Sequence, residues 1–359
     1  MPRKPSRSKI VPDLFVAAVL TKTGNPLEFV EVTTPDELSP GQVLIRMIFS
    51  GACASQIHEI DGRKGPDAFL PHLLGHEAVA EVVWCGPHVQ TVASGDIVVA
   101  HWRKGSGIQS APPTLNSSIG PVNAGSVTTF SQYSVVSENR LSPLPEGISL
   151  ESATLLGCAF TTGFGAVVHE AKVRPGESAL IVGFGGIGIS ILKTLKLVSS
   201  TPVVVLDVSE EKLELAMALG ADHAFNVNLG PEEIHQRISR VMGSEGADIA
   251  FEATGIKSAI EMAYRLTNSE GRTLLLGVPD SQDPAVIPTL PLHLGKQLLG
   301  SHGGSSNPDV DIPRIAAIVR AGLLNLDDFP IATYDFGDIG QALETLRSGT
   351  LGRVLIKFS

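Results

Sequence analysis

The stretch Ala-Leu-Ile-Val-Gly-Phe-Gly-Gly-Ile-Gly, residues 179–188, decides the fold class of this chain. Its first four residues form an apolar run that is typical of a strand buried on both faces. Gly183 permits a tight turn after that strand, Gly185 lets the backbone approach a diphosphate, and Gly188 allows close helix packing. Free N–H groups at the start of the following helix favour anions. The pattern predicts a dinucleotide site on a Rossmann fold.

A carboxylate follows the next apolar run, 203–206. Asp207 lies 19 residues beyond Gly188. It can bind both ribose hydroxyls and would repel a 2′-phosphate, so the sequence favours NAD over NADP. Lys212 could pair with Asp207 or approach the ribose. The alternatives are a helix N-cap role for Asp207 and an ordinary exposed helix position for Lys212.

Strands and helices alternate around this motif, with further strands expected at 248–252 and 273–276. Such alternation is typical of a doubly wound parallel sheet, so the fold class is α/β. Residues 14–165 are instead rich in short apolar runs separated by Gly and Pro, which favours strands. The last strand, 353–358, needs a sheet to join. We therefore expect one domain from residues 1–165 and 301–359, with a Rossmann domain inserted at 166–300.

Composition and charge exclude several classes of protein. The chain of 359 residues is 43% apolar and carries a net charge of −10, which argues against a nucleic-acid partner. No apolar run approaches the roughly 18 residues of a membrane span, and the basic start lacks the apolar core of a signal peptide. The three cysteines cannot all pair, and Cys85 reads as a packing residue. Free thiols favour a cytoplasmic location.

Two cysteines and one histidine form a candidate metal site. Cys53, His76 and Cys158 are far apart in the sequence, as is usual for a catalytic metal that the tertiary structure holds. Two thiolates and one imidazole leave a fourth position of zinc open for water or substrate. The alternatives are that the cysteines are small buried hydrophobic residues and that His76 is a hydrogen-bonded core histidine.

Six blocks in a fixed order extend over nearly the whole chain, and they carry a resemblance to a known family: Gly51–Gly62, Gly75–Ala78, Gly95–Asp96, Gly157–Ala166, Gly183–Gly188 and Gly246–Gly255. The chain resembles the zinc-dependent alcohol dehydrogenases of the medium-chain dehydrogenase/reductase superfamily. Its local blocks are most similar to the glutathione-dependent formaldehyde dehydrogenase branch. The resemblance implies a GroES-like β-barrel catalytic domain with an inserted Rossmann domain. It also implies that Cys53, His76 and Cys158 bind a catalytic zinc, and that the protein forms a homodimer or homotetramer.

The resemblance also marks one departure. Many relatives carry a structural zinc on a lobe with four cysteines, which would lie at 103–127 here. That segment contains no cysteine, so we expect one catalytic zinc per subunit and no structural zinc. Because residues 103–128 are rich in Gly, Ser, Pro and Asn, we expect a long surface loop.

The family's proton path implies roles for three further residues. Ser55 lies at the position that touches the substrate oxygen, and His58 lies where the relay ends at solvent. Glu77 follows the ligand histidine. It would either coordinate the metal transiently or adjust the properties of the metal site without coordinating it. The alternatives are a turn hydroxyl for Ser55, an exposed histidine without function for His58 and a structural carboxylate for Glu77.

The remaining positions concern the cofactor and the substrate. His101 and Trp102 would line the substrate pocket, although core packing is an equal alternative. The resemblance also implies that Thr162, Ile187, Gly277, Val278 and Arg353 contact the cofactor. The alternatives are packing for Thr162 and Ile187, a plain strand-end turn for Gly277 and Val278, and a surface position for Arg353. The full set of cofactor-binding candidates is Thr162, Gly183, Gly185, Gly186, Ile187, Gly188, Asp207, Lys212, Gly277, Val278 and Arg353.

Together these features predict an NAD-dependent oxidoreductase that interconverts an alcohol with an aldehyde or ketone. Zinc would stabilise the alkoxide, and nicotinamide would accept the hydride. One competing interpretation is a zinc-free enone or quinone reductase of the same superfamily, whose members lack the Cys/His/Cys set. Another is a non-catalytic NAD-binding scaffold. The substrate stays open: Arg103 and Lys104 are the only candidates near the pocket for binding the carboxylates of a glutathione adduct, and a polar alcohol is an alternative.

Overall fold

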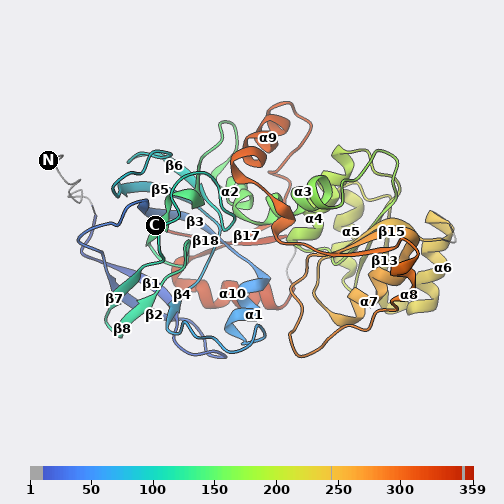
Figure 1. Ribbon diagram of the computed structural model, residues 1–359, viewed down its shortest axis with the longest axis horizontal. Helices are drawn as coiled ribbons and strands as arrows, with labels where there is room; N and C mark the ends of the chain where they lie inside the picture. Colours follow the sequence, from blue (N-terminus) through green and yellow to red (C-terminus); the bar gives the residue numbers. More distant parts are fainter. Residues whose placement is uncertain (1–10, 244, 350–351) are drawn as a thin grey trace. The chain divides into compact units, whose positions relative to one another are not determined.

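The computed structural model describes residues 11–243, 245–349 and 352–359, and it divides into two compact units (Figure 1). Unit 1 contains the residues up to Cys158 and those from Asn307 onward. Unit 2 is Ala159–Ser306, somewhat longer at both ends than the inserted domain expected at 166–300.

Unit 1 contains a closed barrel and a second sheet. The barrel strands, in the order β1-β2-β7-β8-β4, are β1 (Leu14–Leu20), β2 (Glu28–Thr33), β7 (Thr114–Ser117), β8 (Gly120–Asn123) and β4 (His72–Leu73). The second sheet has the order β10-β6-β5-β3-β18-β17, with β9 paired to β3. Its strands are β3 (Gln42–Ala52), β5 (Ala78–Cys85), β6 (Ile97–Ala100), β9 (Tyr133–Ser137), β10 (Leu141–Pro143), β17 (Ile331–Asp335) and β18 (Arg353–Lys357).

Strand β1 shows why this unit has two apolar cores. Ala18 and Leu20 pack into one core, whereas Phe15, Ala17 and Val19 pack into the other. Successive side chains of a strand point to opposite faces, so a strand buried on both sides needs apolar residues at every position. The last strand, β18, pairs antiparallel with β3, as expected for a chain that returns to its first sheet.

The helices of unit 1 are short, apart from α9. They are α1 (Ala54–Ile60), α2 (Leu150–Thr154), α9 (Pro308–Arg320) and α10 (Ile339–Arg347). The sequence also predicts a helix at 313–321, and the predicted start is wrong, because α9 begins at Pro308. Asn307 caps the helix by accepting a hydrogen bond from the Asp309 N–H, and Pro308 takes the first helical position, which leaves Pro313 inside.

The expectation of a long loop at 103–128 is also wrong in part, because β7 and β8 form a hairpin there. Leu115 and Val122 pair across it and are buried in the barrel. Gly120 has φ +103° at the turn, a conformation that favours glycine. Four-residue strands between Gly, Ser and Pro carry too little periodic signal to be distinguished from a loop.

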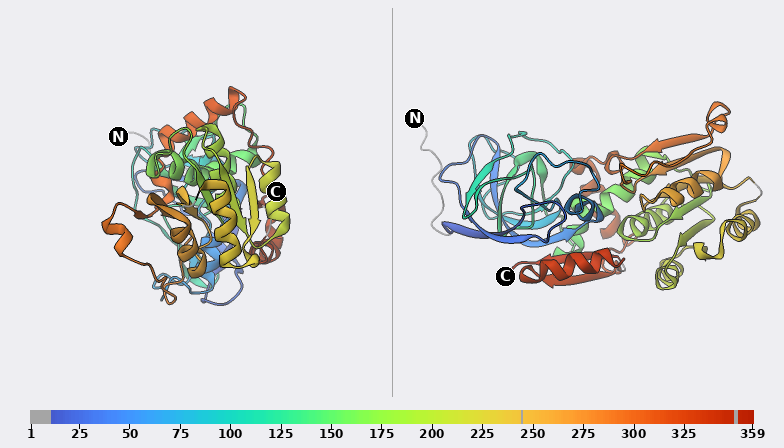
Figure 2. Two further views of the ribbon diagram at one scale, coloured as in Figure 1. Left: turned by 90° about the vertical axis from the view of Figure 1, so that its right-hand side faces the viewer. Right: turned by 90° about the horizontal axis from the view of Figure 1, so that it is seen from below.

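Unit 2 is a six-stranded, fully parallel sheet with the order β13-β12-β11-β14-β15-β16. This is the Rossmann strand order, and helices pack against the sheet (Figure 2). The strands are β11 (Ala179–Val182), β12 (Val203–Asp207), β13 (His223–Asn226), β14 (Ala247–Glu252), β15 (Thr267–Leu275) and β16 (Gln297–Gly300). The helices are α3 (Ala159–Gly165), α4 (Gly186–Leu197), α5 (Glu210–Ala218), α6 (Pro231–Met242), α7 (Lys257–Leu266) and α8 (Leu290–His293).

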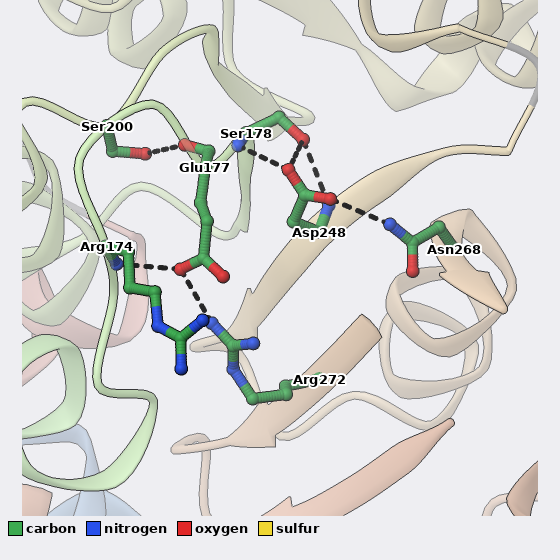
Figure 3. A network of polar contacts seen from close by, with 7 residues as sticks. All are labelled: Arg174, Glu177, Ser178, Ser200, Asp248, Asn268 and Arg272. Carbon is green, nitrogen blue, oxygen red and sulfur yellow. Dashed lines mark hydrogen bonds and ion pairs between the residues drawn. The ribbon is translucent and has the colours of Figure 1, made fainter. Parts of the chain in front are cut away.

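A polar network ties together the strand ends opposite the glycine loop (Figure 3). The Asp248 carboxylate accepts from both the backbone N–H and the hydroxyl of Ser178 at 2.8 Å, and from Asn268 at 2.9 Å. Glu177 accepts from the Arg174 N–H and pairs with Arg272. These bonds connect the beginnings of β11, β14 and β15, which are neighbouring strands of the sheet.

Within the described residues, no single helix is long and apolar enough to cross a membrane.

Candidate active site

Unit 1 brings the three predicted metal ligands together. One ligand atom each of Cys53, His76 and Cys158 lies within 4.8 Å of the others. Cys53 directly precedes α1, and Cys158 follows a short 3-10 helix, Leu155–Gly157. His76 follows Gly75, whose φ of +86° and tight packing against Thr129 leave no place for a side chain. Two sulfur donors and one nitrogen suit zinc, so the residues present fit the predicted metal.

The two thiols differ in acidity. A hydrogen bond from Cys158 lowers the pKa of Cys53 well below its ordinary value, with help from the Arg353 guanidinium and His76 and against the effect of burial. The same hydrogen bond and burial raise the pKa of Cys158. One sulfur therefore ionises readily, and a bound cation would favour ionisation of the second.

Behind the metal cluster, Glu77 and Arg353 form a buried ion pair. Arg353 Nε donates to Glu77 Oε1 at 2.7 Å, and Nη2 contacts the same oxygen. Arg353 is 4% exposed and Glu77 is 0% exposed. Burial raises the pKa of Glu77, although Arg353 opposes this, and Glu77 in turn helps to raise the pKa of Arg353. Gly51 carries no side chain because the Glu77 carboxylate occupies that space.

The proton-path candidates Ser55 and His58 lie three residues apart on α1 and therefore share one side of the helix. Both are half-buried. His58 Nδ1 has no hydrogen-bond partner among the described residues. Partial burial, together with Arg63 and Lys64, lowers the pKa of His58, so the imidazole is neutral at pH 7.

The two pocket candidates differ in their surroundings. His101 is 1% exposed, with Nδ1 2.8 Å from the Arg103 carbonyl and Nε2 3.0 Å from the Ser142 hydroxyl. Burial lowers its pKa to about 4. This arrangement supports the core-packing alternative for His101. Trp102 is half-buried, and the Arg103 guanidinium lies 5.6 Å from its ring centre.

In unit 2 the glycine loop has the geometry that the sequence predicts. Gly183 follows β11 with φ +93°, and α4 begins at Gly186 with Gly185 as its cap. The Asp207 carboxylate accepts backbone hydrogen bonds from Phe184 at 2.7 Å and from Val208 at 2.8 Å. It therefore holds the turn after β11 and the end of β12 together.

The other cofactor candidates of unit 2 lie on the elements around this loop. Ser209, not Asp207, caps α5, and its hydroxyl accepts from the N–H of the half-buried Lys212. Gly277 and Val278 follow β15, and the Gly277 N–H donates to the Glu252 carbonyl at 3.1 Å. Thr162 is buried on α3, Ile187 is half-buried on α4, and Gly188 is buried on α4.

Two features near the metal cluster escape the sequence analysis. Gln56 is 1% exposed, and its Oε1 accepts the Cys53 N–H at 2.8 Å. Glu59, Asp67 and His72 form a second cluster, with one ligand atom of each within 4.8 Å of the others. The Gln at the third position of α1 is a local signal for a capping residue. The second cluster has no local signal, because its members come from a helix, a loop and a strand.

Comparison with known proteins identifies the class of protein. Residues 39–146 match the family described as alcohol dehydrogenase GroES-like domain, and residues 186–317 match the family described as zinc-binding dehydrogenase. The chain belongs to the zinc-dependent alcohol dehydrogenases of the medium-chain dehydrogenase/reductase superfamily, and it is an oxidoreductase of that class.

Individual relatives match over nearly their whole length. The chain is 28% identical to an S-(hydroxymethyl)glutathione dehydrogenase of Synechocystis sp., covering 95% of this chain and 99% of that protein. It is 27% identical to alcohol dehydrogenase 6 of Peromyscus maniculatus, covering 95% and 96%. A solved structure of an alcohol dehydrogenase zinc-binding domain protein from Burkholderia ambifaria has a TM-score of 0.86 at 25% identity, covering 96% of this chain and 99% of that one.

Proposed function

We propose that this chain is a zinc- and NAD-dependent alcohol dehydrogenase that interconverts an alcohol with its aldehyde or ketone. The observation that carries the proposal is the convergence of Cys53, His76 and Cys158 within 4.8 Å in unit 1. When bound, zinc supplies a Lewis acid that lowers the pKa of the substrate hydroxyl, and NAD accepts the hydride.

The residues of this chain hold the proton and the cofactor. The Ser55 hydroxyl accepts the substrate proton while it passes on its own, and the neutral His58 imidazole delivers the proton to solvent. Asp207 is positioned by backbone hydrogen bonds at the end of β12, where it binds the ribose and disfavours a 2′-phosphate. Arg353 holds Glu77 in place, and the Glu77 carboxylate contributes to the electrostatic potential at the metal site.

We further propose a single zinc per subunit, because the segment 103–127 has no cysteine that could hold a second. The free thiols favour a cytoplasmic enzyme, and the family favours a homodimer or homotetramer. A zinc-free reductase would have no use for the metal cluster, and a scaffold protein would have no use for Ser55 and His58. Both alternatives are therefore disfavoured.

Zinc analysis of Cys53→Ala beside Cys85→Ala tests the proposal. The Cys85 thiol contacts the Val92 carbonyl at 3.6 Å and belongs to no metal cluster among the described residues, so its variant is a matched control. We expect about one zinc in the wild type and in Cys85→Ala, and loss of zinc and of NADH formation in Cys53→Ala. Retained zinc and turnover in Cys53→Ala would remove Cys53 from the site. An active enzyme without metal would overturn the zinc mechanism.

A further inference from the structure

Unit 1 contains a cavity of about 510 Å³ beside the metal cluster. His76 is one of its lining residues, and the opposite walls come from β4, β7 and β8. This volume is in the range that binds small organic molecules. Because the cavity reaches a predicted metal ligand, it is a candidate for the space that the body of the substrate occupies, an inference that rests on the proposed function.

Most of the wall is apolar. Phe69, Leu73, Leu74, Val127 and Pro113 line it, so an aryl or alkyl group would be removed from water there.

One polar side chain of the lining, Gln56, has a buried donor without a partner among the described residues. The Gln56 side chain is 1% exposed, and the Cys53 N–H fixes its Oε1 at 2.8 Å. That bond orients the amide, and Nε2 then has no partner among the described residues. A buried donor without a partner costs free energy, so a small shift of this side chain toward a polar atom in the cavity would be favourable.

The lining contains one carboxylate, that of Glu59. Apart from His76, its ionisable members are Glu59 and His72, and none of the lining residues is Lys or Arg. Asp67 lies behind them, with its Oδ2 2.8 Å from His72 Nε2. Lys64 pairs with Glu59 at 2.9 Å but does not line the cavity.

We propose that this cavity receives the body of the alcohol and discriminates against substrates that carry a carboxylate, with Glu59 as the residue that sets the discrimination. A carboxylate there would meet the Glu59 carboxylate, and none of the described lining residues is Lys or Arg, so the like charges would repel. A neutral group would be accepted, and an ammonium group would be attracted. Alcohols that carry several carboxylates, glutathione adducts included, are then poor substrates.

Three para-substituted benzyl alcohols of similar size test this inference. The substituents are hydroxymethyl, carboxylate and aminomethyl. Binding to the zinc-loaded full-length chain is measured by calorimetry, and turnover with NAD is measured by NADH absorbance. We expect the carboxylate to bind about fivefold more weakly than the neutral alcohol, and the amine at least as tightly as the neutral alcohol.

Variants locate the effect. In Glu59→Gln, Lys64 loses its partner, and the ratio of carboxylate to neutral binding should rise about fivefold. In Thr114→Lys, which adds a cation to the lining, the ratio should rise as well. Glu146→Gln is the control because Glu146 is exposed and lies outside the lining.

An equal affinity of the wild type for the carboxylate and the neutral alcohol would refute the inference. So would an unchanged ratio in both lining variants, or no binding of any of the three compounds. Selective binding without NADH formation from any alcohol would leave the cavity assignment intact and would count against the proposed function.

Discussion

Disruption of the buried ion pair between Glu77 and Arg353 should lower the stability of the fold. In Arg353→Met, the Glu77 carboxylate, which is 0% exposed, loses the guanidinium that pairs with it. Removing one partner of a buried pair costs about 3–5 kcal/mol, so we expect a loss of this size in the free energy of unfolding at pH 8. Urea denaturation of the metal-free protein measures it. The double variant Glu77→Gln/Arg353→Met should be more stable than the single variant, since it does not leave one charge of this pair buried alone.

The sign of the pH dependence follows from the direction of the pKa shift. Burial already raises the pKa of Glu77 although Arg353 opposes it, so removal of Arg353 raises it further. A carboxyl whose pKa is higher in the folded state destabilises the fold above that pKa, and the penalty disappears as the group is protonated. The difference in stability between wild type and Arg353→Met should therefore shrink as the pH falls toward about 5.

A surface pair supplies the control. Arg46 and Glu81 form an ion pair between β3 and β5, with side chains that are 46% and 29% exposed. Arg46→Met should cost less than about 1 kcal/mol. A loss in Arg353→Met that is equally small, or that does not change between pH 8 and pH 5, would refute the reasoning. Because Arg353 also lowers the pKa of Cys53, thiol alkylation of the metal-free variant should require a higher pH than in the wild type.

Three further perturbations have defined outcomes. His58→Asn should lower kcat/KM for alcohol oxidation about tenfold to a hundredfold near pH 7 and change the pH profile, whereas His88→Asn, at an exposed position, should not; equal profiles would exclude His58 from the relay. Asp207→Ala should raise the NADP to NAD ratio of kcat/KM about tenfold, and an unchanged ratio would place the discrimination elsewhere. Glu138→Gln should destabilise the segment 103–128, seen as faster amide exchange at residue 108, because the Glu138 carboxylate accepts the Ile108 N–H at 2.8 Å. Protection equal to that of the wild type would contradict this role.

The nucleotide loop could be predicted because its information is local. The apolar run of β11, the positive φ at Gly183 and the carboxylate at the end of β12 all lie within about thirty residues. Each of these features has a single physical cause that can be identified from a few neighbouring residues. The start of α9 shows the limit of the same approach. Both Pro308 and Pro313 are compatible with a first turn, and only the contact between Asn307 and the Asp309 N–H decides between them.

The surroundings of the metal cluster could not be predicted, because they depend on distant pairs. Arg353 and Glu77 are separated by 276 positions, and no pattern in either segment identifies the other. Their contact results from the pairing of β18 with β3, where Val354 lies opposite Ala52. For His101 the sequence suggests a pocket position, and distant contacts again decide the matter. A histidine after an apolar strand is compatible with a pocket, and only the Ser142 hydroxyl and the Arg103 carbonyl place it in the core.

The lobe at 103–128 shows how a segment without cysteines is ordered by other means. Glu138 is 1% exposed, and its carboxylate accepts backbone N–H groups from Gln90 at 2.5 Å, Thr91 at 2.8 Å and Ile108 at 2.8 Å. Burial alone would raise the pKa of Glu138, but these three donors lower it below its ordinary value. The contribution to stability is therefore present at neutral pH and is lost as the pH falls through that lowered pKa. A buried carboxylate that accepts three backbone N–H groups connects loops that are distant in the sequence. This segment is therefore cross-linked without cysteine ligands to a metal. The hairpin β7–β8, which begins six residues after Ile108, supplies Thr114 and Asn123 to the cavity wall, so we expect Glu138→Gln to affect the selectivity proposed for Glu59 as well.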